Sequence, residues 1–332
     1  MMNFIVVSQG RDLGFFRNFN SADFQIRATC ENENDNTFEF SICANDYNRD
    51  FHKFGNYIYR AGSEEGGIIK IITSTTDGII RIGGPTWRGI LSKKIIQPPE
   101  GQDYMTVSGD VHEVIRQLIG NDLGKLFFVR PSAGGVTINA YQFRRYVTLL
   151  DGLTAMLSSV NMRLSITYKE TVGAIELAAI QIADYSKQEE VSQNTTRVGV
   201  EVVDNRAGIN HLICLGAGEL KERLVIHLYV WPDGSIRDKQ YYKGLDEVTE
   251  TYEYTSESDV IKLKEYGMER MKERMNQKSI TINAAEINAE IGDRIGGRDY
   301  VTNTSVSAIV SGRITSISDG IEKVTHEVEK GE

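Results

Sequence analysis

Three short motifs have residue types that could carry chemistry, but each lacks a residue that the chemistry needs. His112 and Glu113 open a pattern similar to a zinc-protease helix, yet Arg116 stands where the second histidine is required one turn later. Segment 214–221 has two glycines after a predicted strand, as a dinucleotide-binding loop has, but lysine replaces the third glycine. Segment 31–36 alternates acidic and amide residues like a calcium loop, without the loop's glycine or its terminal bidentate glutamate. We expect an amphipathic helix at the first motif, no nucleotide site at the second and a solvated hairpin tip at the third.

The other reactive side chains are not grouped in the sequence. There is neither a nucleophile elbow nor a P-loop, and four more histidines have no plausible partner nearby: His52, His211, His227 and His326. Carboxylates are abundant, which leaves open a pair suited to glycoside hydrolysis. The sequence therefore predicts no catalytic residue, no cofactor-binding residue and no metal ligand, and it favours a protein that is not an enzyme.

The three cysteines, Cys30, Cys43 and Cys214, show neither a disulfide framework nor metal-ligand spacing. Around 38–42, Cys43 has the opposite alternation parity to the apolar residues, so a bridge to Cys30 conflicts with the simplest hairpin. We expect reduced thiols, as in a cytosol.

Composition predicts a soluble globular protein that does not grip nucleic acid. Apolar residues make up 40% and charged residues 25% of the chain, which is ordinary. The formal net charge of −9 argues against a phosphate-binding surface, because such surfaces cluster Lys and Arg. The N-terminus lacks the charged region of a signal peptide, and no stretch approaches the roughly 20 apolar residues of a membrane helix. A length of 332 residues favours two or three domains.

Strands dominate the sequence up to about residue 100. Segments 24–28 and 38–42 alternate apolar and polar residues, which predicts a hairpin. A second pair, 68–72 and 79–82, is expected across Asp77-Gly78, a strong turn dipeptide.

Helical periodicity appears in the middle of the chain and again near residue 260. An apolar stripe follows Asp110 and closes at Gly120, and a longer stripe over 143–160 predicts the longest middle helix. A later helix is expected over 256–278, with Ser256 and Asp259 as a capping box.

The remaining segments read as strands. Strand signals return at 164–168, and 224–231 and 236–242 form a predicted hairpin through Pro232-Asp233-Gly234. Asp319-Gly320 turns into a last strand over 321–328.

Gly83-Gly84-Pro85 predicts a tight turn, because glycine allows positive φ angles and proline lacks an amide donor. A short apolar strand, 90–96, is expected after it and stops at Pro98-Pro99. Arg-Ile-Gly-Gly occurs at 81–84 and again at 294–297, where Gly296 and Gly297 predict a second such turn. The repeat suggests a duplicated β-module.

Segment 81–99, with these glycines, resembles the signature of the siphovirus tail hub family, which includes the N-terminal region of tail-associated lysins. Segment 141–152, Tyr-Gln-Phe-Arg-Arg-Tyr-Val-Thr-Leu-Leu-Asp-Gly, is similar to the family's central helix. Segment 292–302 is similar to its C-terminal strand-turn-strand. The three matches keep the family's order along the chain.

The resemblance implies an α+β, mainly β protein with two tail-tube-like β-barrel domains and a helix-containing inserted domain. We expect the first barrel over 1–100, the insert over 101–165, and the second barrel region over 166–332 with its helix near 256–278. It further implies a structural baseplate hub of a phage or prophage tail tip, made in the bacterial cytoplasm and located in the virion tail.

The resemblance also implies partners: two more copies in a homotrimer, the tail tube and distal tail proteins, and tip or receptor-binding proteins. DNA would be passing cargo, and membrane insertion by this chain is not expected. An acidic protein suits a channel through which DNA slides, since like charges repel.

Aromatic residues are the expected contact residues, because tyrosine and tryptophan are enriched at interfaces. The candidates are Trp87, Trp231, Tyr241 and Tyr242, although aromatics at strand ends also cap cores. Two other functions stay open: a peptidoglycan hydrolase acting on the host wall, and a module that binds host glycans through exposed aromatics.

Overall fold

The computed structural model describes residues 4–32, 34–132, 135–185, 190–192, 199–283, 289–299 and 304–328. They form two compact units. Unit 1 comprises the described residues within Met1–Val200, Thr281–Gly296 and Ile309–Glu329, and unit 2 those within Glu201–Ile280 and Gly297–Ala308. The domain boundaries predicted near 100 and 165 both fall inside unit 1.

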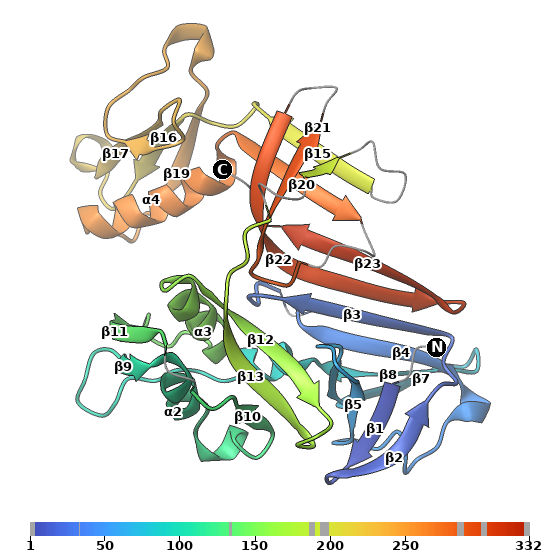
Figure 1. The fold of residues 1–332 in the computed structure, drawn as a ribbon. Coiled ribbons are helices and arrows are strands. Elements are labelled where there is room, and N and C mark those ends of the chain that lie inside the picture. Colours follow the sequence, from blue (N-terminus) through green and yellow to red (C-terminus); the bar gives the residue numbers. More distant parts are fainter. Residues whose placement is uncertain are drawn as a thin grey trace. The chain divides into compact units, whose positions relative to one another are not determined.

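The largest sheet joins the two ends of the chain (Figure 1). Its strands are, in spatial order, β15 (Gly199–Asn205), β20 (Gln277–Asn283), β23 (Ile321–Val328), β22 (Thr304–Ser318), β3 (Ser21–Arg27), β4 (Thr37–Cys43), β8 (Ile79–Pro85) and β7 (Ile71–Ser74). β21 (Arg294–Asp299) pairs with β22 and with β14 (Glu190–Ser192). The antiparallel register of β22 with β3 runs from Gly312 opposite Arg27 to Ser318 opposite Ser21.

Several predicted hairpins are confirmed in this sheet. β3 pairs with β4, and β7 with β8, as the alternation of apolar residues indicates. Gly78 and Gly320 have φ angles of 80° and 75°, the left-handed conformation that the two Asp-Gly turns require.

A second sheet covers the phenylalanines of the first. Its strands are β2 (Arg11–Phe16), β1 (Phe4–Ser8), β5 (Tyr57–Arg60) and β6 (Gly66–Ile68). The ring of Phe4 lies 5.3 Å from that of Phe24 and 5.1 Å from that of Phe40, measured between centroids, and Phe16 lies 4.8 Å from Phe40. This aromatic cluster is the hydrophobic contact between the two sheets.

Three α-helices and two small sheets complete unit 1. The helices are α1 (Trp87–Ser92), α2 (Val111–Leu123) and α3 (Leu149–Ser158), with the short 3₁₀ turn η1 (Ala44–Asp46). The strands are β9 (Thr106–Asp110), β10 (Phe127–Val129), β11 (Thr137–Gln142), β12 (Met162–Lys169) and β13 (Ala174–Gln181). β10, β13 and β12 form one sheet, and β9 pairs with β11.

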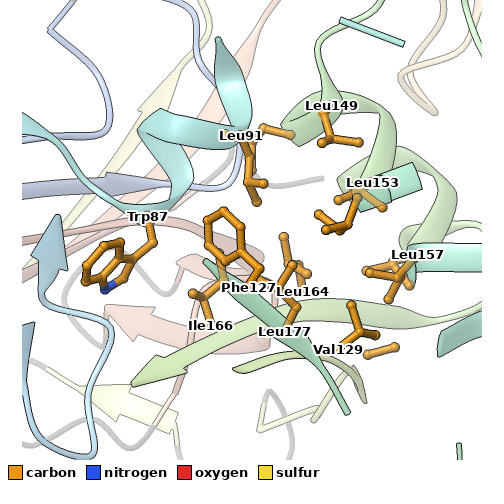
Figure 2. Packing of buried hydrophobic residues seen from close by; sticks show 14 of the residues in the cluster. Trp87, Leu91, Phe127, Val129, Leu149, Leu153, Leu157, Leu164, Ile166 and Leu177 are labelled. Atoms are coloured by element: carbon orange, nitrogen blue, oxygen red, sulfur yellow. The ribbon is translucent and has the colours of Figure 1, made fainter. Parts of the chain in front are cut away.

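The side chains of these elements meet in one hydrophobic core, shown in Figure 2. Trp87 and Leu91 project from α1, and Leu149, Leu153 and Leu157 from α3. The sheet of β10, β13 and β12 packs against these helices through Phe127, Val129, Leu164, Ile166 and Leu177. The predicted helical segment therefore does not stand apart from the first 100 residues but shares a core with α1.

Three predictions about this region are wrong in whole or in part. Residues 90–96 do not form a strand, because α1 begins at Trp87, where the Thr86 hydroxyl caps it by accepting from the Gly89 amide at 3.3 Å. The helix predicted from residue 143 begins only at Leu149, where the Thr148 hydroxyl caps it by accepting from the Asp151 amide at 3.0 Å. The stop predicted at Gly120 is a kink with φ 61° inside α2.

Residues 211–274 of unit 2 form a small sheet covered by one α-helix. Its strands are, in order, β18 (Ile236–Arg237), β17 (Val225–Val230), β16 (His211–Leu215) and β19 (Thr249–Glu253); the helices are η2 (Leu220–Glu222), η3 (Gly244–Asp246) and α4 (Val260–Arg274). α4 packs on the sheet where Gly267 lies against Cys214, since a Cβ at this glycine would overlap the cysteine sulfur. The predicted hairpin and the helix are confirmed, but the predicted capping box of Ser256 and Asp259 is wrong: α4 begins at Val260, and Asp259 itself caps it by accepting from the Ile261 amide.

The fold is mainly β with several sheets and four α-helices among the described residues. Two barrels are not confirmed, since no closed barrel forms within these residues. The repeated Arg-Ile-Gly-Gly also does not mark equivalent strands. β8 follows both of its partners, β4 and β7, along the chain, whereas β21 stands between β14 and β22. Among the helices that the structure describes, none has the length and apolar character needed to cross a membrane.

Candidate functional site

The glycines of the two repeats lie within strands, so the predicted turns are wrong. Gly83, Gly84 and Pro85 belong to β8, and Gly296 and Gly297 to β21. At Gly84, a Cβ would overlap the carbonyl oxygen of Ile68, and at Gly83 it would lie 2.6 Å from that of Phe38. These glycines are therefore needed for close approach between β8 and its neighbours, not for a positive φ angle.

Trp87 is not an exposed contact residue. Its side chain is fully buried in unit 1, and its ring lies against Gly66 of β6. Its indole Nε1 has no hydrogen-bond partner among the described residues. The prediction that Trp87 is a contact residue is therefore wrong, since Trp87 belongs to the hydrophobic core.

The other three predicted aromatics meet in unit 2. The Trp231 ring lies 5.2 Å from that of Tyr241, which lies 5.0 Å from that of Tyr242. Arg237 lies over the Trp231 ring at 4.1 Å, and the Trp231 indole donates to the Lys239 carbonyl at 2.8 Å. Tyr241 is half exposed. This aromatic cluster is a surface on which a protein or a sugar could pack.

The other candidate site is a charged cavity of about 360 Å³ in unit 1. Three arginines and two glutamates line it, together with hydroxyls and a few apolar atoms; the charged residues are Glu64, Arg88, Arg163, Glu290 and Arg313. The sequence did not indicate this site, because its residues are scattered from 64 to 313 and belong to no motif.

Each cavity carboxylate is held by an arginine. Arg88 donates to Glu64 through Nε at 2.6 Å, and both side chains are almost fully buried. Arg313 contacts Glu290 and Glu65, each at 3.2 Å. Carboxylates bound in this way are poor general bases, so the cavity favours cross-linking of the chain over catalysis.

Two further ion pairs extend the network and join distant parts of the sequence. Arg163 donates to Asp293 at 2.8 Å, and Arg60 to Glu322 at 2.6 Å. Burial disfavours the charged form of Glu65 and would raise its pKa, but the positive charge of Arg313 outweighs this effect. The pKa of Glu65 therefore lies below its usual value. The segments 289–296 and 309–328 are thus fastened to the first 170 residues by charge as well as by strand pairing.

His326 lies opposite Arg313 in the pairing of β22 with β23. Its side chain is 3% exposed, and its Nδ1 finds no partner among the described residues. Burial, together with the positive charge of Arg313, lowers the pKa of His326. The folded protein therefore favours the neutral imidazole more than the unfolded chain does.

We expect the protein to lose stability as the pH falls below about 6.5, the pKa of an unfolded histidine. Between that pH and the lowered pKa of His326, the unfolded chain binds the proton and the folded chain does not. His52 and His112 act in the same direction, since burial lowers their pKa too. Urea unfolding from pH 7.5 to 5.5 measures the slope, which should be shallower in His326→Leu. Equal slopes would refute the assignment to His326.

The three chemical motifs of the sequence have structural roles. His112 lies on α2 and its Nε2 accepts from the Ala179 amide at 3.2 Å. Cys214 is buried in unit 2, which raises its thiol pKa to about 11. The predicted solvated tip at 31–36 is wrong in part, because Asp35 and Asn36 are buried and bond the surrounding backbone.

No protein-family model and no curated protein matches the sequence. Solved structures match its fold along nearly the whole chain. A tail protein from Neisseria meningitidis MC58 matches with a TM-score of 0.52 at 13% identity. The match covers 99% of this chain and 96% of the Neisseria protein. The 43 kDa tail protein of prophage MuSo2 from Shewanella oneidensis has a TM-score of 0.55 at 10% identity, covering 98% of each chain.

The prophage tail protein gp18 from Listeria monocytogenes EGD-e matches with a TM-score of 0.52 at 11% identity. The match covers 99% of this chain and 95% of gp18. The fold of this chain is thus that of phage tail proteins, and the resemblance seen in its motifs is confirmed at the level of fold.

Proposed function

We propose, from a fold shared along nearly its whole length with three phage tail proteins, that this chain is a structural protein of a phage or prophage tail. The observation that carries the proposal is the coverage, because both units of this chain and almost all of each tail protein are included in the match.

Within the tail, the chain serves as the hub that joins the tail tube to the tip proteins and surrounds the DNA channel. A closed ring of identical chains needs one heterologous interface repeated by rotation. The net charge of −9 suits passage of DNA without adhesion. The proposal includes no catalytic step, since arginines hold the carboxylates of the charged cavity. Release of fragments from purified cell walls by this chain alone would contradict that part.

We expect the assembled hub to contain three chains of 37.2 kDa each. One contact surface is the edge of β7, the last strand of the largest sheet, which no other strand of the described residues pairs with and where Ile71 is 58% exposed. Edge strands offer unpaired backbone groups to a neighbouring chain, and a charged side chain there opposes pairing. Ile71→Lys should therefore weaken the trimer without unfolding the monomer, as measured by light scattering and by incorporation into purified tails.

Ile321→Lys is the matched control, because Ile321 is 72% exposed and pairs with Ser318 of β22 beside the Asp319-Gly320 turn, away from the edge of β7. This variant should assemble normally. If it disrupts assembly while Ile71→Lys does not, the edge of β7 is not the contact. If the wild-type chain is monomeric at high concentration and absent from purified tails, the hub proposal fails.

A further inference from the structure

Two histidines of unit 2 face each other although 16 positions separate them in the sequence. β16 and β17 are antiparallel, with His211 opposite Tyr229 and Ile213 opposite His227, so the histidines are diagonal neighbours. The Nε2 of His211 lies 2.9 Å from the Nδ1 of His227. Neither histidine belongs to the cluster of Trp231, Tyr241 and Tyr242 or to the edge of β7 proposed for assembly.

A carboxylate orients the first of these rings. The Nδ1 of His211 lies 2.7 Å from Oε1 of Glu247, and a carboxylate can only accept. Nδ1 therefore carries the hydrogen, and the lone pair of His211 lies on Nε2, directed at His227. The ring of Tyr229 stacks on His211 with centroids 4.4 Å apart and restricts its rotation.

The pair lies on the face of the sheet that α4 does not cover. The alternate residues of the same strands, Leu212, Cys214 and Leu228, form the core with Leu263 and Met271 of α4. Side chains alternate between the two faces of a strand, so His211 and His227 point away from that core. His227 is exposed, and solvent reaches the pair from its side.

We propose that His211 and His227 form a two-histidine site for a late first-row divalent cation such as Zn²⁺, with Glu247 as a positioning residue. Imidazole nitrogens bind these cations, and a ligating histidine usually donates its other N–H to a carboxylate, as His211 does to Glu247.

Two nitrogens about 2.0–2.1 Å from a tetrahedral zinc lie roughly 3.3 Å apart, so the pair needs to open only slightly from 2.9 Å. His227 then carries its hydrogen on Nε2 instead of Nδ1, and no net proton is released. Among the described residues there is no set of three His, Cys, Asp or Glu side chains that could hold a metal ion, so water fills the remaining positions.

Calorimetry with ZnCl₂ on the full chain, freed of metal by chelation, tests the proposal. We expect one Zn²⁺ per chain, lost in His227→Gln, an exposed position where the fold is kept. Glu247→Gln should keep the stoichiometry and weaken binding about 10- to 100-fold, the usual effect of removing such a carboxylate. Glu250→Gln is the matched control, because Glu250 bonds Arg270 and Arg274 on the α4 side, and it should bind like the wild type.

Nitrogen-15 spectra of the histidines give a second readout, in which Zn²⁺ should shift His211 Nε2 and His227 Nδ1 together. No binding at millimolar Zn²⁺ would overturn the proposal. Equal affinity in the wild type and His227→Gln would also overturn it. Neither result bears on tail assembly, which light scattering measures separately.

Discussion

Replacing Trp87 by alanine should lower the free energy of unfolding by about 3–5 kcal/mol, the usual loss for a large aromatic in a core. Its side chain is fully buried and shares the core with Leu91 and with Ile166 of β12. The truncation leaves a cavity at the contact of α1 with β6, where the indole fills the space beside Gly66. Urea unfolding at pH 7.5 measures the change.

Two variants separate a core role from a contact role. Trp87→Phe should cost less than Trp87→Ala, because the indole Nε1 has no partner among the described residues to lose. Trp231→Ala removes a partly exposed ring of unit 2 and should also cost less. If Trp87→Ala unfolds like the wild type and only weakens assembly, Trp87 is a contact residue as first predicted.

Replacing Arg88 by methionine should destabilise the protein by about 3–5 kcal/mol, because one partner of a buried ion pair is left charged and unpaired. Arg88 and Glu64 are 2% and 7% exposed, and Arg88 also donates to the Leu164 carbonyl at 3.0 Å. Methionine keeps much of the volume but supplies no donor, so Glu64 stays buried without its counter-ion. Thermal and urea unfolding both report the loss.

The double variant Glu64→Leu with Arg88→Met should recover much of that stability, since apolar residues of similar volume can replace a buried pair. Arg81→Ala is the surface control. Arg81 and Glu39 are 45% and 56% exposed at 3.6 Å, and removing such a pair costs about 0–1 kcal/mol. If Arg88→Met lowers the free energy of unfolding no more than Arg81→Ala does, the ion pair in the charged cavity does not stabilise unit 1.

These two substitutions affect adjacent residues of α1 that act in different ways. Trp87 fills the hydrophobic core, and Arg88 enters the ion-pair network.

Local patterns in the sequence determined the hairpin of β3 with β4, the two Asp-Gly turns, and the existence of the helices α2 and α4. Their signals lie within a few residues: alternation, a 3.6-residue period, a cap or a turn dipeptide. The same sequence also predicted the tail-protein fold through three motifs.

Only the tertiary structure decided what depends on distant residues. Segment 90–96 is apolar enough for a strand, but the Thr86 cap and the burial of Trp87 favour the helix α1, which takes residues 90–92 and ends at Ser92. The ion pairs of Arg163 and Arg60 join residues 130 and 262 positions apart, and the histidine pair depends on the register of β16 with β17. Strand register and ion pairing over such separations follow from packing of the whole chain, which periodicity does not encode.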